Sequence, residues 1–441
     1  MAKKTRKKTL KIPSRDIERT VLDNGVRVIS ERVKGSPAAL TSLWVDSGAR
    51  YENLNESGAT HLIQRLALHG AGGRSADRIA KEIGRLGGAF EAQTERDSAV
   101  YQMRVSPDDI QAGTKLITDI ALRPSLTQAA LTAESDKLLE ELRALEKDAD
   151  LVLERMFLRS LWKGHGLCRE PRGRLLTVRG QTKLEAFKPN KLKSFHTHSH
   201  HPNALTFVAA GNVRHDAIEK LAEKLLGSLE HPKSTASTIT PKTYKFLALR
   251  NRPQFSKVRV EIGFPTCAAA DKERHAAALL NAVIGGGPGS RLALLASEGD
   301  LPTLAVSSQL RMFSDVGCLS IRARSDRANA ETVIQQIVDE LWRIADKQVD
   351  EDELERARAI RKAALLSEVD SLPNRVTGLA CAERYHKRIV PLEEEFEALE
   401  QVTPKAVQQL ASLWVNPYEL SMAVLGNLAN LKIGRRMLDR N

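Results

Sequence analysis

The 441-residue sequence predicts an α+β protein of two homologous lobes, each with an antiparallel sheet packed against helices. Three observations support this fold class: an internal duplication, alternating strand-like and helix-like hydrophobic patterns, and a 42% hydrophobic content that allows more than one core. No run of eighteen apolar residues occurs, so we expect no membrane-spanning helix. The four cysteines lie far apart without C-x-x-C spacing, which predicts reduced thiols and no thiolate metal site.

The chain opens with a basic segment, residues 1–17, in which no acidic residue precedes Asp16. Six cations in this segment supply half of the formal net charge of +12: Lys3, Lys4, Arg6, Lys7, Lys8 and Lys11. We interpret the segment as a solvated, disordered arm, with an anionic surface or nucleic acid as the alternative partner. Aromatic residues are only 4% of the chain and do not interleave with the basic ones, so we expect no nucleic-acid stacking surface.

The ends of the two halves show the duplication best. Residues 201–213 and 416–428 both have a proline at the second position and an apolar run that ends in a Gly-Asn pair. Each pattern predicts a loop, a buried strand and a turn.

A second pair of similar segments lies upstream in each half. Residues 94–105 resemble residues 312–323, with Asp97 and Asp315 in register before alternating apolar positions. The alternation predicts one more strand per lobe, with an aspartate at equivalent places.

Helical stretches separate these strands, with apolar residues every three or four positions. They cover residues 131–146, 216–226, 331–344 and 352–368. Pro, Ser and Thr are frequent in residues 232–241, which favours an extended connection between lobes. The expected organisation is an arm at 1–17, an N-terminal lobe at 18–230, a linker at 231–244 and a C-terminal lobe at 245–441.

Residues 61–65, His-Leu-Ile-Gln-Arg, stand where an inverted zinc-protease motif, H-x-x-E-H, would place its working groups. His61 matches the first zinc ligand. Gln64 cannot act as the general base, and Arg65 replaces the second imidazole with a cation that has no lone pair for a metal. The motif therefore predicts a protease-like site without its chemistry.

With this motif and these repeats, the chain resembles the M16 (pitrilysin/insulinase) peptidase family, in the branch with the mitochondrial processing peptidase subunits and the cytochrome bc1 core proteins. Three blocks carry the resemblance over roughly residues 18 to 430: Val45-Asp-Ser-Gly-Ala-Arg-Tyr-Glu52, Gly58-Ala-Thr-His61-Leu-Ile-Gln64-Arg65 and Leu86-Gly-Gly-Ala-Phe-Glu-Ala-Gln-Thr-Glu-Arg-Asp-Ser-Ala-Val-Tyr101. The resemblance implies the two-lobed LuxS/MPP-like metallohydrolase fold. It also implies zinc as the cofactor of active members.

By the same resemblance, Glu141 matches the third zinc ligand of the family, and Glu134, two helical turns earlier, matches a carboxylate behind it. Two ligands beside a guanidinium are too few for a catalytic zinc, so we expect no zinc cofactor here. Our hypothesis is that Arg65 occupies the place of the metal and pairs with Glu141.

In the C-terminal lobe, the family's active complexes carry an arginine and a tyrosine that grip substrate, and this chain has Ser297 and Leu304 there. The glycine-rich run before them is kept, and its candidate substrate-handling residues are Gly285, Gly286, Gly287 and Gly289. The alternative is that these glycines only form a turn between helices.

Other histidines suggest two further metal sites. A displaced site built from His61, His69 and Glu141 is one alternative, since the two histidines lie on one helical face. The second is a cluster of His196, His198, His200 and His201, which we expect to be exposed on a loop because closeness in sequence does not give converging ligands.

The predicted function is a non-catalytic M16-type subunit that pairs with an active zinc-bearing homologue carrying an intact H-x-x-E-H motif, or with itself, around a peptide substrate in a shared chamber. One alternative is a structural core-type subunit of a larger, respiratory-like assembly. The other is a zinc metallopeptidase with an altered site. The expected location is cytoplasmic, with the mitochondrial matrix side as the alternative, and no nucleic-acid partner is expected.

Overall fold

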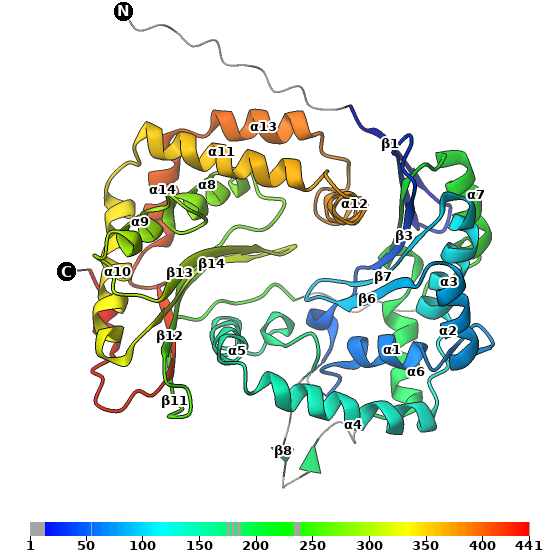
Figure 1. Cartoon of the computed structure of the whole chain (residues 1–441), viewed down its shortest axis with the longest axis horizontal. Coiled ribbons are helices and arrows are strands. Elements are labelled where there is room, and N and C mark those ends of the chain that lie inside the picture. Colours follow the sequence, from blue (N-terminus) through cyan, green and yellow to red (C-terminus); the bar gives the residue numbers. More distant parts are fainter. Residues whose placement is uncertain are drawn as a thin grey trace, which may run out of the picture.

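The computed structural model describes residues 14–53, 55–173, 177–178, 181–182, 187–232 and 239–440. Two sheets, each covered by helices, form two lobes of α+β architecture (Figure 1), as predicted. Most of the basic arm and the middle of the linker lie outside the described residues. No described helix has both the length and the apolar character needed to cross a bilayer.

The N-terminal sheet has six strands in the order β1-β2-β10-β3-β7-β6. Their bounds are Asp16–Val21 (β1), Arg27–Arg32 (β2), Leu205–Gly211 (β10), Ala39–Val45 (β3), Ala99–Val105 (β7) and Ala89–Thr94 (β6). Neighbours are antiparallel except β2 and β10, which are parallel. The parallel pair is possible because a long helical excursion separates the two strands in sequence.

The C-terminal sheet repeats this order with five strands, β11-β15-β12-β14-β13. Their bounds are Leu247–Asn251 (β11), Ser421–Gly426 (β15), Val258–Thr266 (β12), Gly317–Ser325 (β14) and Ala305–Met312 (β13). β11 and β15 form the parallel pair of this sheet. Gly211 and Gly426 end equivalent strands with φ of 134° and 145°, so both predicted Gly-Asn turns need a glycine.

In each half, helices of that half pack against one face of the sheet, either directly or through another helix. In the N-terminal half they are α1 (Ala59–Ala67), α2 (Ala76–Arg85), α3 (Ile110–Leu122), α4 (Gln128–Leu145), α6 (Pro189–Ser199) and α7 (His215–Leu226). In the C-terminal half they are α8 (Arg274–Ile284), α9 (Arg291–Ser297), α10 (Ala330–Asp346), α11 (Glu351–Ser367), α13 (Leu392–Gln401) and α14 (Pro404–Trp414). All four helical stretches predicted from sequence correspond to α4, α7, α10 and α11.

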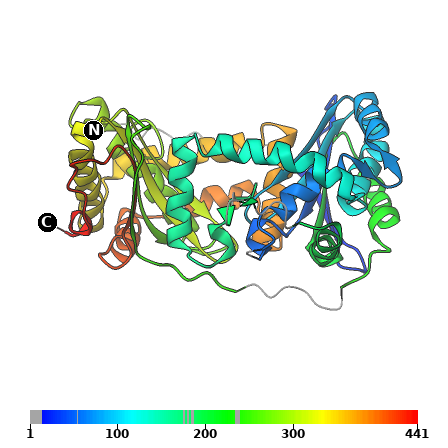
Figure 2. The ribbon, with the colours of Figure 1, turned by 90° about the horizontal axis from the view of Figure 1, so that it is seen from below.

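Two helices pack on the sheet of the other half. Helix α5 (Ala149–Leu161) places Phe157 and Leu161 against Cys318 and Leu425 of the C-terminal sheet. Helix α12 (Leu372–His386) packs on β3 and β10 of the N-terminal sheet. Figure 2 shows the blue-green α4 reaching from the N-terminal lobe toward α5 on the C-terminal side. The exchange joins the lobes through apolar cores.

A buried arginine holds the lobes together where the repeat predicted equivalent aspartates. Arg50 lies 2.9 Å from Asp97 in the β6–β7 turn and 2.6 Å from Asp315 in the β13–β14 turn. Its side chain is almost fully buried, and the hydrogen bonds that it donates to two carboxylates compensate for the desolvation of its charge. The duplicated residues thus meet at one guanidinium between the lobes.

Candidate functional site

Helix α1 carries the degenerate motif, and Glu52 caps its N-terminus. The Glu52 carboxylate accepts hydrogen bonds from the backbone amides of Gly58, at 2.6 Å, and Thr60, at 2.9 Å. Burial raises the pKa of Glu52 to about 7, although these hydrogen bonds act in the opposite direction. The first sequence block, which ends at Glu52, therefore fixes the start of the helix that presents His61.

Arg65 lies one turn after His61 on α1 and bridges two carboxylates of α4. Its Nε donates to Glu134 Oε2 at 2.7 Å, and its NH1 donates to Glu141 Oε1 at 2.6 Å. The predicted pairing of Arg65 with Glu141 is confirmed. The contact with Glu134 is the more buried of the two, since 7% of the Glu134 side chain is exposed against 47% for Glu141.

Glu134 is the centre of this group. Beside Arg65, it accepts from Lys137 at 2.9 Å and contacts His69 Nε2 at 2.9 Å. Burial raises the pKa of Glu134, but the hydrogen bonds from His69, Lys137 and Arg65 outweigh it and lower the pKa to about 2. In the sequence, His69 follows Arg65 by four residues, and this helical spacing indicated that the two side chains share a face. The contact of His69 with Glu134 depends on how α4 packs.

His61 lies beside this cluster as a neutral imidazole. Burial, followed by the positive charge of Arg65, lowers its pKa to about 4. Its Nε2 is buried and has no hydrogen-bond partner in the described part of the chain. The ring therefore lies next to a guanidinium that neither accepts a hydrogen bond from it nor offers a lone pair to a metal.

Gln64 anchors the end of the N-terminal sheet. Its side-chain amide donates to the backbone carbonyls of Gln93, at 3.1 Å, and Val100, at 3.2 Å. Its carbonyl oxygen accepts from the Thr94 hydroxyl at 2.7 Å. A glutamate carboxylate could not donate to those two carbonyls, so this position now ties α1 to strands β6 and β7.

These residues do not fit a catalytic zinc. Such a site needs three protein ligands and an open position. His61 and Glu141 are the two ligand-type residues at the family positions, and the guanidinium of Arg65 is bound to Glu141. Within the described residues, no three His, Cys, Asp or Glu side chains converge as metal ligands, and this includes the alternative set with His69.

The histidine cluster near residue 200 differs from the exposed loop that was predicted. His196 lies on α6, is buried, and contacts the Ala121 carbonyl at 2.7 Å through Nε2. His200 is also buried and stacks on His196 with ring centroids 4.1 Å apart. The prediction of exposure is wrong for these two because α6 turns them against α3 and Tyr101, whereas His198 is exposed as expected.

The glycine-rich run connects α8 to α9 and packs tightly. A Cβ on Gly285 would lie 2.9 Å from the Ser308 amide nitrogen, and one on Gly286 would lie 2.8 Å from the Ala282 Cα. Gly287 has room for a Cβ, and Gly289 has a φ of +82°. Close packing thus accounts for two of the glycines, and a role in substrate handling stays a prediction.

The structure also shows the two positions at which active complexes of the resembled family carry an arginine and a tyrosine. They are Ser297 and Leu304 in this chain. Ser297 ends α9, and its hydroxyl donates to the Leu294 carbonyl at 2.8 Å. Leu304 precedes β13 and is 50% exposed. Neither side chain has the charge or phenol group needed to grip a peptide backbone.

Two family models match the chain. One, described as insulinase (peptidase family M16), matches residues 27–172, and the other, described as the peptidase M16 inactive domain, matches residues 186–361. The first covers α1 and both carboxylates of α4, and the second covers most of the C-terminal sheet.

Similar proteins extend over nearly the whole chain. An uncharacterized zinc protease of Mycobacterium leprae is 27% identical over 427 residues, which is 95% of this chain and 94% of the relative. The mitochondrial-processing peptidase subunit beta of Saccharomyces cerevisiae is 24% identical over 430 residues, 93% of this chain and 91% of the relative.

Among solved structures, a protease from Helicobacter pylori superposes with a TM-score of 0.84 at 20% identity, covering 93% of this chain and 100% of that one. A peptidase M16 inactive domain from Pseudomonas fluorescens gives the same TM-score at 18% identity, covering 93% of this chain and 98% of that one. At these identities the structures show a common fold.

Proposed function

The chain belongs to the M16 peptidase family, and we propose that within this family it is a non-catalytic subunit. It pairs with a homologue that retains the intact H-x-x-E-H motif, and the two together enclose a chamber for peptides. The contribution of this chain is shape and binding surface, and the bond-breaking chemistry belongs to the partner.

The observation that carries the proposal is the bridge from Arg65 to Glu134 and Glu141. It satisfies both carboxylates at the family's metal position with a permanent cation. A metal ion entering this site would have to displace a guanidinium held by two charge-assisted hydrogen bonds, and it would then find His61 as its single imidazole at the family positions. With Gln64 donating to two carbonyls, a general base is also missing.

A free sheet edge supports a peptide-binding role. Strand β6 lies at one edge of the N-terminal sheet and pairs with β7 alone among the described strands. An extended peptide can add to such an edge through backbone hydrogen bonds. In edge strand β13 of the C-terminal sheet, the Ser308 amide already donates to the Gly285 carbonyl at 2.9 Å. In β6 the engaged group is an acceptor, the Gln93 carbonyl, which accepts from Gln64. We propose β6 as the peptide-binding edge because Gln64 connects it directly to the motif helix α1.

The structural core-type role remains a second candidate because of one specific feature. Ser297 and Leu304 remove the family's substrate grip as well, so this chain has lost groups from both lobes. A subunit used only as a scaffold requires neither set.

Reconstitution tests the proposal. The purified chain, an H-x-x-E-H homologue from the same source, and their equimolar mixture are assayed for zinc content, for complex formation by size-exclusion chromatography, and for hydrolysis of a quenched fluorescent peptide. We expect no turnover and substoichiometric zinc for the chain alone, and a complex more active than the homologue by itself. The matched control is the double variant Gln64→Glu/Arg65→His, which should gain zinc.

Two other results would favour the alternative functions. Chelator-sensitive turnover with one zinc per wild-type chain would favour an altered active site and overturn the proposal. Failure to bind the homologue, together with recovery of respiratory-chain subunits in a native pull-down, would favour the scaffold.

A further inference from the structure

A cavity of about 410 Å³ lies in the C-terminal half, apart from the degenerate motif on α1. Helices α8, α11, α12 and α13 and strand β13 form its walls, and α12 is the helix that packs on the N-terminal sheet. The cavity thus lies where the two lobes meet, which is a common place for small-molecule sites. Its volume is within the usual range for such sites, roughly 300–1,000 Å³.

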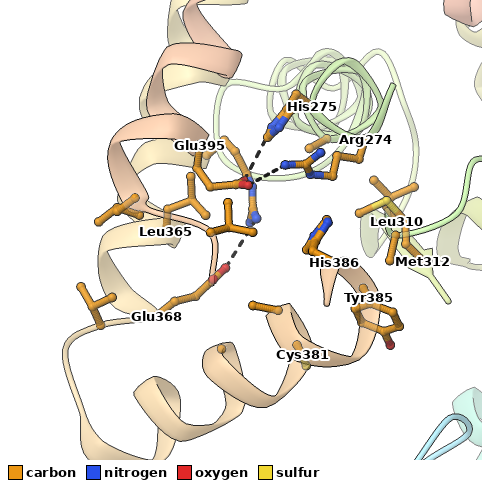
Figure 3. Close-up of a pocket in the computed structure, with 18 of the residues that line it drawn as sticks. Arg274, His275, Leu310, Met312, Leu365, Glu368, Cys381, Tyr385, His386 and Glu395 are labelled. Atoms are coloured by element: carbon orange, nitrogen blue, oxygen red, sulfur yellow. Dashed lines mark hydrogen bonds and ion pairs between the residues drawn. The ribbon is translucent and has the colours of Figure 1, made fainter. Parts of the chain in front are cut away.

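Two walls of the cavity are apolar. Leu310 and Met312 of β13 line one side and Leu365 of α11 the other, with Cys381 of α12 at the base (Figure 3). None of these side chains offers a strong hydrogen bond, so the part of a ligand that lies against them is apolar. Asn281, Arg361 and Tyr385 also line the cavity and supply polar groups. Burial raises the pKa of the Cys381 thiol to about 11, which keeps it neutral.

One end of the cavity has spare hydrogen-bond donors. Arg274 donates to Glu395 at 2.7 Å, and the second oxygen of Glu395 is 3.7 Å from His275 Nδ1. A guanidinium has five N–H groups, and this contact uses one of them. His386 points toward the same group (Figure 3) and forms no hydrogen bond with the described residues. Burial, followed by the charge of Arg274, lowers its pKa, so the ring is neutral.

The other end has a carboxylate with spare acceptor capacity. Glu368 lies beyond Leu365 (Figure 3), is half exposed, and has a single long contact of 3.5 Å with Arg361. Arg15 also lines the cavity, but Glu31 holds its guanidinium through two hydrogen bonds. Arg15 is balanced by Glu31, Arg274 by Glu395 and Arg361 by Glu368, so the cavity has no net charge and does not select a simple ion.

We propose that this cavity binds a short peptide with free ends and apolar side chains. The peptide carboxylate accepts from Arg274 and His386, its ammonium group donates to Glu368, and its side chains lie between Leu310 and Leu365. The proposal is independent of the zinc motif and of any partner chain, because every group involved lies outside α1 and α4.

Isothermal titration of the full chain with three dipeptides tests the two ends separately: Leu-Leu, its acetylated form without the ammonium, and its amidated form without the carboxylate. We expect Leu-Leu to bind and each blocked form to bind at least tenfold more weakly. If none of the three gives heat at millimolar concentration, or if the blocked forms bind as well as Leu-Leu, the proposal is wrong.

Variants locate the site. Glu368→Gln should weaken the binding of Leu-Leu at least fivefold and leave the binding of the acetylated form unchanged. Only Leu-Leu has an ammonium group that the Glu368 carboxylate can bind. The control Glu394→Gln changes an exposed partner of Arg388 outside the cavity lining and should have no effect. An equal loss in the two variants would refute the assignment.

A steric variant gives a second, independent readout. Gly378 of α12 lines the cavity, and a Cβ built on it meets no atom within 4 Å. Gly378→Leu should therefore fill the cavity without removing a charge, keep or raise the melting temperature, and abolish binding. Retained binding in a variant that melts like the wild type would overturn the proposal. If Gly378→Leu does not fold, Glu368→Gln decides, since its half-exposed side chain is not part of the core.

Discussion

The Arg65 bridge makes a quantitative prediction for Arg65→Met, which keeps the apolar stem and removes the charge. Breaking a fully buried ion pair costs about 3–5 kcal/mol, and an exposed one about 0–1 kcal/mol. The Arg65 side chain is 22% exposed, Glu134 7% and Glu141 47%. We therefore expect a loss of about 2 kcal/mol through Glu134 and about 0.5 kcal/mol through Glu141.

Urea unfolding followed by far-UV circular dichroism measures this loss, and double-mutant cycles divide it. Glu134→Gln should couple to Arg65→Met more strongly than Glu141→Gln does. Arg78→Met is the matched control, because Arg78 is 67% exposed and pairs with Glu82 one turn away. Its cost should be at most about 0.5 kcal/mol. A cost for Arg65→Met no larger than this control, or stronger coupling to Glu141, would refute the reasoning.

Three further predictions concern other parts of the molecule. Arg50→Met should cost about 3 kcal/mol, because it leaves a buried aspartate in one lobe and a partly buried one in the other without their cation, and limited proteolysis should then separate the lobes more readily. The folded state holds the pKa of His61 near 4 against an ordinary value of 6.5, so its contribution to stability is complete above pH 6.5 and is lost as the pH falls toward 4; His61→Asn should flatten this part of the pH–melting curve, and an unchanged slope would contradict it. Gly285→Ala should lower the melting temperature because its Cβ would press on the backbone of β13, whereas Gly287→Ala, which has room, should not.

The sequence alone determined the fold class and showed that two side chains of the motif are replaced. Duplicated strand ends and apolar periodicity are local patterns. They predicted two lobes and the correct helices because each pattern spans only a short stretch of sequence. Gln64 and Arg65 stand where the motif has a glutamate and a histidine. Their side-chain types alone show that the motif's base and second imidazole are absent, since neither supplies the lone pair that those roles require.

Only the tertiary structure decided which groups replace the lost ones. Helical spacing places Glu134 and Glu141 on one face of α4, but the approach of α1 determines that Arg65 reaches both and that His69 shares Glu134. The burial of His196 likewise depends on where α6 packs.

The exchange of α5 and α12 between lobes, and the cavity that α12 helps to enclose, were also invisible in the sequence. An amphipathic pattern states that a helix has an apolar face. It does not state which sheet will cover that face, because contacts between residues more than a hundred positions apart are set by the packing of the whole chain.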